Sequence, residues 1–131
     1  MRVKSFRGLL ALGALLLAAL PAFAHHSFTA EFDGNRVGVV KGVLTKVLWT
    51  NPHIFLFMDV TEANGKIVQY AFASGPPAKM HRAGVKKEDF DIGDTVVMTF
   101  APAKDGTKNL GWMKTIKYSD GHVFVYRDGS E

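Results

Sequence analysis

The 131-residue chain contains no cysteine. A disulfide framework, a thiolate metal site and a thiol nucleophile are therefore excluded, and the fold has to be stabilised by core packing. Residues 25–131 contain no internal repeat and no low-complexity segment. They also lack a glycine-rich phosphate loop, paired catalytic carboxylates and a recognisable order of serine, histidine and acid. An enzymatic function would therefore depend on a bound metal.

The chain also lacks a hydrophobic run long enough to span a membrane, because the run from Gly8 to Leu20 is shorter than the roughly 20 residues required. Three basic residues precede this run, and Ala22 and Ala24 follow it as the small residues that a signal peptidase requires. This pattern predicts a secretory signal over residues 1–24, cleaved after Ala24. We expect a periplasmic protein without stable membrane insertion after cleavage, although the signal is equally compatible with full secretion.

Little net charge remains once residues 1–24 are removed. The signal holds three basic and no acidic residues, so 13 Lys and Arg face 12 Asp and Glu, a formal charge of +1. This balance gives no electrostatic reason to expect nucleic acid or an anionic membrane as a partner. The remaining 107 residues, 131 less 24, suit one small domain.

Alternating apolar residues predict an all-β domain over residues 37–131, preceded by an N-terminal arm over residues 25–36. We expect the barrel core to begin near Val37, so that residues 25–33 can be deleted without loss of the fold. The expected strands are Val37 to Trp49, His53 to Thr61, Ile67 to Ala73, Thr95 to Ala103, Leu110 to Tyr118 and His122 to Tyr126.

Local signals add detail to this pattern. Asn64-Gly65 favours a tight hairpin, and Pro76 or Pro77 can begin a short helix that ends near Arg82. Phe90 and Ile92 are expected to plug the core. In the fifth expected strand, Leu110, Trp112, Ile116 and Tyr118 have the even spacing of residues on one face.

The predicted order is three strands, one short helix, two strands and an extra strand, which favours a small OB-like barrel of five to six strands. The first strand is long, and Gly38 and Gly42 fall on one face of it. Glycine at such positions marks a bend or a close backbone approach. A small sandwich or another partly open barrel has the same strand count and stays an alternative.

Three sequence motifs together resemble one family. They are His25-His26-Ser27-Phe28 with Glu31-Phe32-Asp33, then Trp49-Thr50-Asn51-Pro52-His53, and Gly93-Asp94 before a strand. The combination resembles an exported proteobacterial family catalogued as domain of unknown function 6152, over essentially the whole mature chain. The resemblance supports the OB-like fold and the exported location, and it implies no activity.

The histidines combine metal affinity with suggestive positions. A mature chain beginning at His25 would offer its amino group and its own imidazole as a chelating pair, and His26 or His53 could supply another imidazole. Such a histidine brace suits Cu(II), ahead of nickel or zinc. Glu31 and Asp33 are candidate outer-shell partners that would orient a ligand histidine.

Each candidate has a plainer alternative. The amino terminus of the mature chain, together with the amide and the imidazole of His26, could hold Cu(II) without help from the fold. Alternatively, both opening histidines could simply be solvated. His53 could satisfy a turn backbone instead of facing a cleft, and His81 and His122 are expected at the surface. The acids Glu31 and Asp33 could be solvated.

Six aromatic residues are candidates for a ligand-stacking platform or for the core. They are Trp49, Phe55, Phe57, Tyr70, Trp112 and Tyr126. The leading hypothesis is an exported small binding protein that holds copper at its new amino terminus. The alternatives are a metal-free OB-like module that binds an envelope protein or a small ligand and, less favoured, a copper-dependent oxidoreductase.

Overall fold

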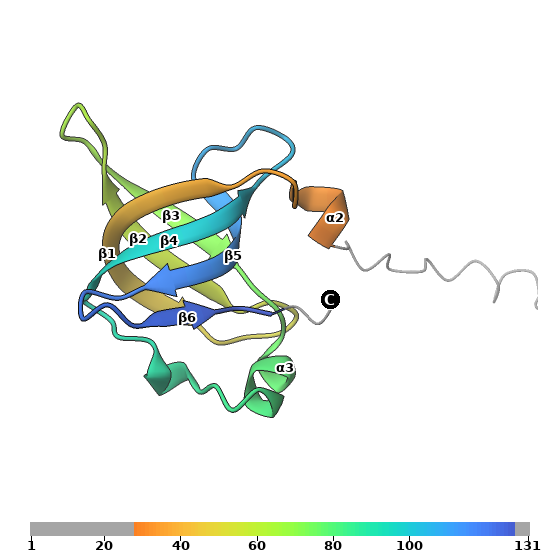
Figure 1. Cartoon of the computed structure of the whole chain (residues 1–131). Coiled ribbons are helices and arrows are strands. Elements are labelled where there is room, and N and C mark those ends of the chain that lie inside the picture. Colours follow the sequence, from red (N-terminus) through yellow and green to blue (C-terminus); the bar gives the residue numbers. More distant parts are fainter. Residues whose placement is uncertain (1–27, 128–131) are drawn as a thin grey trace, which may run out of the picture.

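A computed structural model describes residues 28–127, which form a closed five-stranded β-barrel with a sixth strand and two short α-helices (Figure 1). The predicted signal over residues 1–24, His25 and His26 lie outside the described residues. None of the described helices has the length and apolar character needed to cross a membrane. The elements in chain order are α2 (Phe28–Glu31), β1 (Gly38–Leu48), β2 (Phe55–Thr61), β3 (Ile67–Ala73), α3 (Pro77–Arg82), the 3₁₀ helix η1 (Lys87–Asp89), β4 (Thr95–Pro102), β5 (Leu110–Lys117) and β6 (Val123–Val125).

The strands are hydrogen-bonded in the order β3-β2-β1-β4-β5-β6, and a parallel pairing of β3 with β5 closes the barrel. The other five strand pairings are antiparallel. β1 pairs with β4 along its first half and with β2 along its second half, and Figure 1 shows it curving around the barrel. With a helix between β3 and β4, this is the OB topology, so the predicted fold class is confirmed.

Two glycines give β1 the space to curve. A Cβ built on Gly38 would lie 2.4 Å from the Phe100 ring, and one built on Gly42 would lie 2.4 Å from the carbonyl oxygen of Asp59. Both distances are too short for a real side chain. The expectation of a close approach at these positions is confirmed, because a ring and a backbone pack directly on β1.

A β-bulge in β1 explains why its sequence is apolar on both faces. The register with β2 shifts between Leu44 and Lys46, so Leu44 and Val47 are both buried although their spacing is odd. A bulge inserts one residue into a strand and rotates every side chain beyond it to the other face.

A second bulge divides β5 between two environments. Thr99 of β4 pairs with Thr115 and Phe100 pairs with Met113, which leaves Lys114 as the extra residue. Met113 and Ile116 therefore fill the barrel, whereas Trp112 belongs to a separate cluster. The even spacing from Leu110 to Tyr118 predicted one face, and that prediction is wrong.

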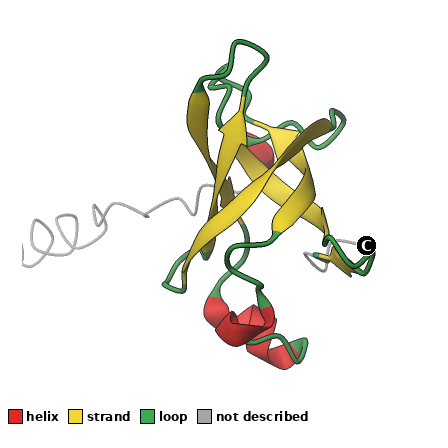
Figure 2. Ribbon diagram, turned by 90° about the vertical axis from the view of Figure 1, so that its left-hand side faces the viewer, coloured by secondary structure: helices red, strands yellow, loops and turns green. Residues whose placement is uncertain are grey.

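The barrel interior holds the main core. One end is covered by α3 and the segment that follows it, which lie together below the strands (Figures 1 and 2). Met80 and Phe90 are buried there, as expected for Phe90. Ile92 is 54% exposed, so its predicted role as a core plug is wrong. The chain turns at this point, with Asp94 N donating to Asp91 O at 3.2 Å, so Phe90 and Ile92 do not face the same side although they are two residues apart.

A second apolar cluster lies on the outer face of the barrel, where α2 packs beside the pairing of β3 with β5 (Figure 1). Phe32 is 4% exposed and forms a β-bridge with Ala103. Val37, by contrast, is 62% exposed. Part of the arm therefore belongs to this outer cluster, which is separate from the barrel core that begins in β1. The expectation that residues 25–33 can be deleted without loss of the fold stays a prediction.

Backbone hydrogen bonds join this part of the arm to the end of β4. Asp33 N donates to Pro102 O at 2.9 Å, and Lys104 N donates to Glu31 O at 2.9 Å. The predicted arm thus contains the short helix α2 and is joined to the end of β4 by a β-bridge.

Candidate functional site

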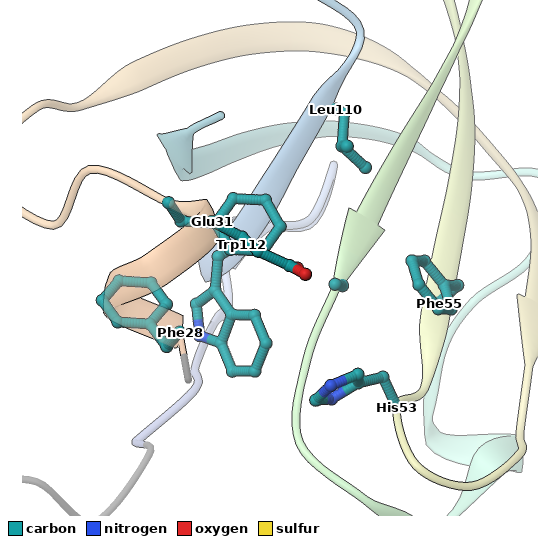
Figure 3. A pocket seen from close by; sticks show the side chains of 8 residues that line it. Phe28, Glu31, His53, Phe55, Leu110 and Trp112 are labelled. Atoms are coloured by element: carbon teal, nitrogen blue, oxygen red, sulfur yellow. The ribbon is translucent and has the colours of Figure 1, made fainter. Parts of the chain in front are cut away.

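A pocket of about 150 Å³ lies between α2 and the outer face of the barrel (Figure 3). Its walls come from the arm, from the entrance and start of β2, from the end of β3 and from the start of β5. The lining residues are Phe28, Glu31, Phe32, His53, Phe55, Ala73, Leu110 and Trp112. Six of these eight side chains are apolar, so Glu31 and His53 supply the polar groups.

The strand register explains why a pocket forms at this place. Phe55 of β2 pairs with Ala73 of β3, and Ala73 pairs with Trp112 of β5. Paired residues point to the same face of a sheet, so a small side chain lies between two large rings. Because the side chain of Ala73 is small, a hollow remains on the outer face of the barrel, and α2 forms the opposite wall of this hollow.

The arm supplies one wall because its two phenylalanines are four residues apart. Phe32 N donates to Phe28 O at 2.9 Å, which completes one helical turn and places both rings on one side. The ring centroids of Phe28 and Phe32 lie 5.2 Å and 5.7 Å from that of Trp112. Tyr126 also contacts Trp112, at 6.1 Å between centroids.

His53 enters the pocket from the segment before β2. Its Nδ1 lies 3.0 Å from the carbonyl oxygen of Ser74. A carbonyl can only accept a hydrogen bond, so Nδ1 carries the hydrogen and Nε2 of the neutral ring holds a lone pair. The ring packs edge-to-face on Trp112 at 5.6 Å between centroids. The two interpretations of His53, facing a cleft and satisfying a backbone carbonyl, therefore both hold.

The two predicted outer-shell acids have different positions. Glu31 lines the pocket with His53, and Figure 3 shows its carboxylate pointing inward. Asp33 does not line the pocket, and its Oδ1 accepts a hydrogen bond from Asn35 N at 3.1 Å in the turn before β1. The fold thus brings one of the two acids to His53.

The predicted metal ligands are only partly described. His25 and His26 lie outside the described residues. Within residues 28–127, no group of three or more histidine and acidic side chains is arranged to hold a metal ion. Of the three predicted ligands, His53 is the one that lies within residues 28–127.

The remaining histidines lie at the surface, as expected. His81 of α3 is exposed and packs against Trp49, with 5.4 Å between ring centroids. The exposed His122 stacks on Tyr118 at 4.2 Å, and its Nδ1 lies 2.5 Å from Asp120 Oδ1. Burial, followed by the nearby carboxylates of Asp91 and Asp94, raises the pKa of Tyr118 to about 12.

The candidate aromatic platform is divided by the fold. Phe55 and Trp112 line the pocket, whereas Trp49 and Tyr70 pack against the barrel core. Phe57 lies next to Phe55 on the outer face, with the Lys46 ammonium 5.6 Å from its ring centroid. Tyr126 contacts both apolar clusters. Two of the six aromatic candidates therefore belong to the site.

The model of a family described as Family of unknown function (DUF6152) matches residues 14–113. The chain belongs to this family. The matched segment includes all eight residues that line the pocket of this DUF6152 protein. No curated protein and no solved structure matches the chain.

Sequence reasoning did not place Phe28, Phe32, Ala73 and Leu110 in a shared site. The spacing of Phe28 and Phe32 is the signal that could have found the arm's contribution, because residues four apart share a helix face. For Ala73 and Leu110 the signal lies in the parallel pairing of β3 with β5, which joins strands that are distant in the sequence.

Proposed function

We propose that this DUF6152 protein is an exported binding protein that holds copper between His53 and the amino terminus left by cleavage after Ala24. The observation that carries the proposal is the hydrogen bond from His53 Nδ1 to the Ser74 carbonyl. Metal-ligating histidines commonly donate their other ring N–H to such a carbonyl, which orients the ring and raises its basicity. This arrangement leaves Nε2 of His53 to bind the metal.

The short covalent tether between the proposed ligands and the pocket supports a shared site. His25 precedes Phe28 by three residues, and Phe28 lines the pocket with His53. A chain spans at most about 3.6 Å per residue, so about 11 Å is the longest span of this tether. Amine and imidazole nitrogens together suit Cu(II) ahead of nickel or zinc.

The decisive experiment compares Cu(II) affinity in the mature protein with three variants. One is extended by a single Gly before His25, the second is His53→Ala, and His81→Ala on α3 is the matched control. The extension and His53→Ala should each weaken Cu(II) binding by about 10–100-fold, which is the range found when a residue that hydrogen-bonds to a metal ligand is removed. His81→Ala should bind copper as tightly as the unmodified protein, because its side chain is exposed and packs on Trp49.

Two outcomes would contradict the proposal. If His53→Ala binds as tightly as the mature protein, the metal is held locally through His26. If a free peptide of residues 25–33 binds Cu(II) as tightly as the whole protein, the fold contributes nothing, and a metal-free binding module becomes the better description. The purified exported protein should also begin at His25, which intact mass and amino-terminal sequencing decide, because any other start removes the brace.

A further inference from the structure

The last strand, β6, lies at an edge of the sheet, where it pairs with β5 on one side (Figure 1). Tyr118 N donates to His122 O at 2.9 Å, so these two residues form a hydrogen-bonded pair of the antiparallel ladder. Hydrogen-bonded and non-hydrogen-bonded pairs alternate along such a ladder. The backbone N–H and C=O groups of Val123 and Val125 therefore point away from β5, toward the open side of β6.

These outward groups have no hydrogen-bond partner among residues 28–127. Apart from its short length, β6 also lacks the features that protect many edge strands, which are lysine, proline, a bulge or a charged side chain that points inward. Val123 and Val125 are each 51% exposed, and Phe124 between them packs against Phe90 at 5.5 Å between ring centroids. An apolar strand of high β-propensity thus presents its backbone for pairing.

The spacing of the outward groups is self-complementary. A second copy of β6, antiparallel to the first and centred on Phe124, places Val123 of each copy opposite Val125 of the other. Each of these two pairs can exchange two N–H···O hydrogen bonds, which makes four in all. The same surface then serves both copies, as a two-fold symmetric dimer requires.

The charges on either side of β6 favour the same register. Asp120 precedes the strand and Arg127 follows it, and both side chains are exposed. In the two-fold arrangement Arg127 lies opposite Gly121 of the second copy, next to the Asp120 carboxylate of that copy. Asp120 Oδ1 accepts a hydrogen bond from His122 N of its own chain at 2.9 Å, so Oδ2 is the oxygen that can accept from the arginine.

The outer face of the sheet favours contact at the edge over contact between two faces. Lys41 of β1 pairs with Val97, Val97 pairs with Lys117, and Lys117 pairs with Val123 of β6. Paired residues share a face, so this row contains two lysines and no acid. Two copies stacked on this face would bring like charges together, whereas pairing through β6 extends the row sideways.

We propose that two copies of the chain pair edge to edge through β6, antiparallel about Phe124, as a two-fold dimer. None of the residues 120–127 lines the pocket, so the inference goes beyond the proposed copper site. A strand of three residues buries little surface, and interfaces below about 1,200 Å² belong to weak complexes. We therefore expect a dissociation constant between about 10 µM and 1 mM.

Sedimentation equilibrium of the mature protein measures this association. Each sample contains a copper chelator, so that no metal bridges two copies and failure of the copper proposal leaves the result unaffected. The average mass should rise from that of one chain toward that of two over the stated range of concentration. The backbone amide hydrogens of Val123 and Val125 should exchange more slowly with solvent as the concentration rises, because they become hydrogen-bonded in the dimer.

Four variants locate the contact. Val125→Pro removes an outward N–H but none that bonds to β5, so it should fold and should weaken the dimer at least about tenfold. Val125→Lys keeps the backbone, adds a charge that protects edge strands, and should weaken the dimer by a similar factor. Arg127→Asp should weaken it about two- to fivefold, the range for exposed charges. Val39→Lys is the matched control and should dimerise unchanged, because Val39 is 60% exposed but β4 and β5 separate its strand from β6.

The mass of a single chain at every concentration would overturn the proposal and leave the β6 edge to a strand of another protein. A dimer that both Val125 variants leave unchanged would overturn it as well. Weaker association of Val39→Lys would place the contact on the outer face, which also contradicts pairing at the edge. Thermal melting shows which variants are folded, and if Val125→Pro is not, Val125→Lys and Arg127→Asp decide the result.

Discussion

Replacing Phe32 with Ala tests whether the arm is part of the fold. The side chain is 4% exposed and packs with Trp112 and three alanines on the outer face of the barrel. Truncation of a buried phenylalanine typically costs about 3–5 kcal/mol, because transfer energy is lost and a cavity remains. A small domain has a total stability of about 5–15 kcal/mol, so this one change removes a large fraction of it.

Thermal unfolding followed by circular dichroism gives the readout. For a domain of this size a loss of 1 kcal/mol lowers Tm by about 4–8 °C, so Phe32→Ala should melt at least about 12 °C below the unmodified protein. Ile92→Ala is the control, since Ile92 is 54% exposed and its truncation should cost less than about 1 kcal/mol. If Phe32→Ala melts within about 3 °C of the unmodified protein, the arm contributes little and the core does begin near Val37.

Three further changes test individual contacts. Gly42→Ala should lower the unfolding free energy in urea by about 1–3 kcal/mol, because its Cβ would lie 2.4 Å from the Asp59 carbonyl oxygen; an unchanged midpoint would contradict the close packing of β1. The pKa of Tyr118 is raised to about 12, so the unfolding free energy that it contributes is complete below pH 10 and is lost as the pH rises to about 12. Across that window Tyr118→Phe should lose less unfolding free energy than the unmodified protein does, by up to about 3 kcal/mol. An equal loss in the two proteins would refute the raised pKa. Hydrogen bonds from Ser119 are the main cause of the lowered pKa of Asp94, so the stability that Asp94 contributes is present above pH 3.8 and is lost as the pH falls below that value. In urea titrations at acid pH, the unfolding free energy of Asp94→Asn should therefore change less with pH than that of the unmodified protein. Parallel curves for the two proteins would contradict this.

The fold was predictable from the sequence because most strands alternate without interruption. Leu56, Met58 and Val60 of β2 are buried in turn, as their period of two requires, and Asn64-Gly65 forms the expected turn with Gly65 at φ 82°. The helix after Pro76 was equally clear. The barrel closure itself follows from a pairing of β3 with β5, which no local pattern specifies.

The site was less predictable, because its parts meet only in the folded chain. His53 and Glu31 were identified as candidates from residue type and position, and they do line one pocket. Trp112 stayed a candidate for a platform or for the core, and its even spacing with Ile116 did not show that the two face opposite sides, because a spacing rule cannot detect the extra residue at Lys114. The buried position of Phe32 also follows from tertiary contacts, as α2 is too short to be stable alone.

The bulge at Lys114 adds a residue to β5 without changing the faces of its neighbours. Because Thr99 pairs with Thr115 and Phe100 with Met113, deleting Lys114 would bring Met113 next to Thr115 in plain alternation. Trp112 would stay outside the barrel, and Met113 and Ile116 would stay inside it. What the domain would lose is Lys114 itself, whose Nζ donates to Gly34 O and whose carbonyl oxygen accepts from Tyr126 N. The inserted residue thus joins both ends of the domain to β5, the arm through its side chain and the segment after β6 through its backbone.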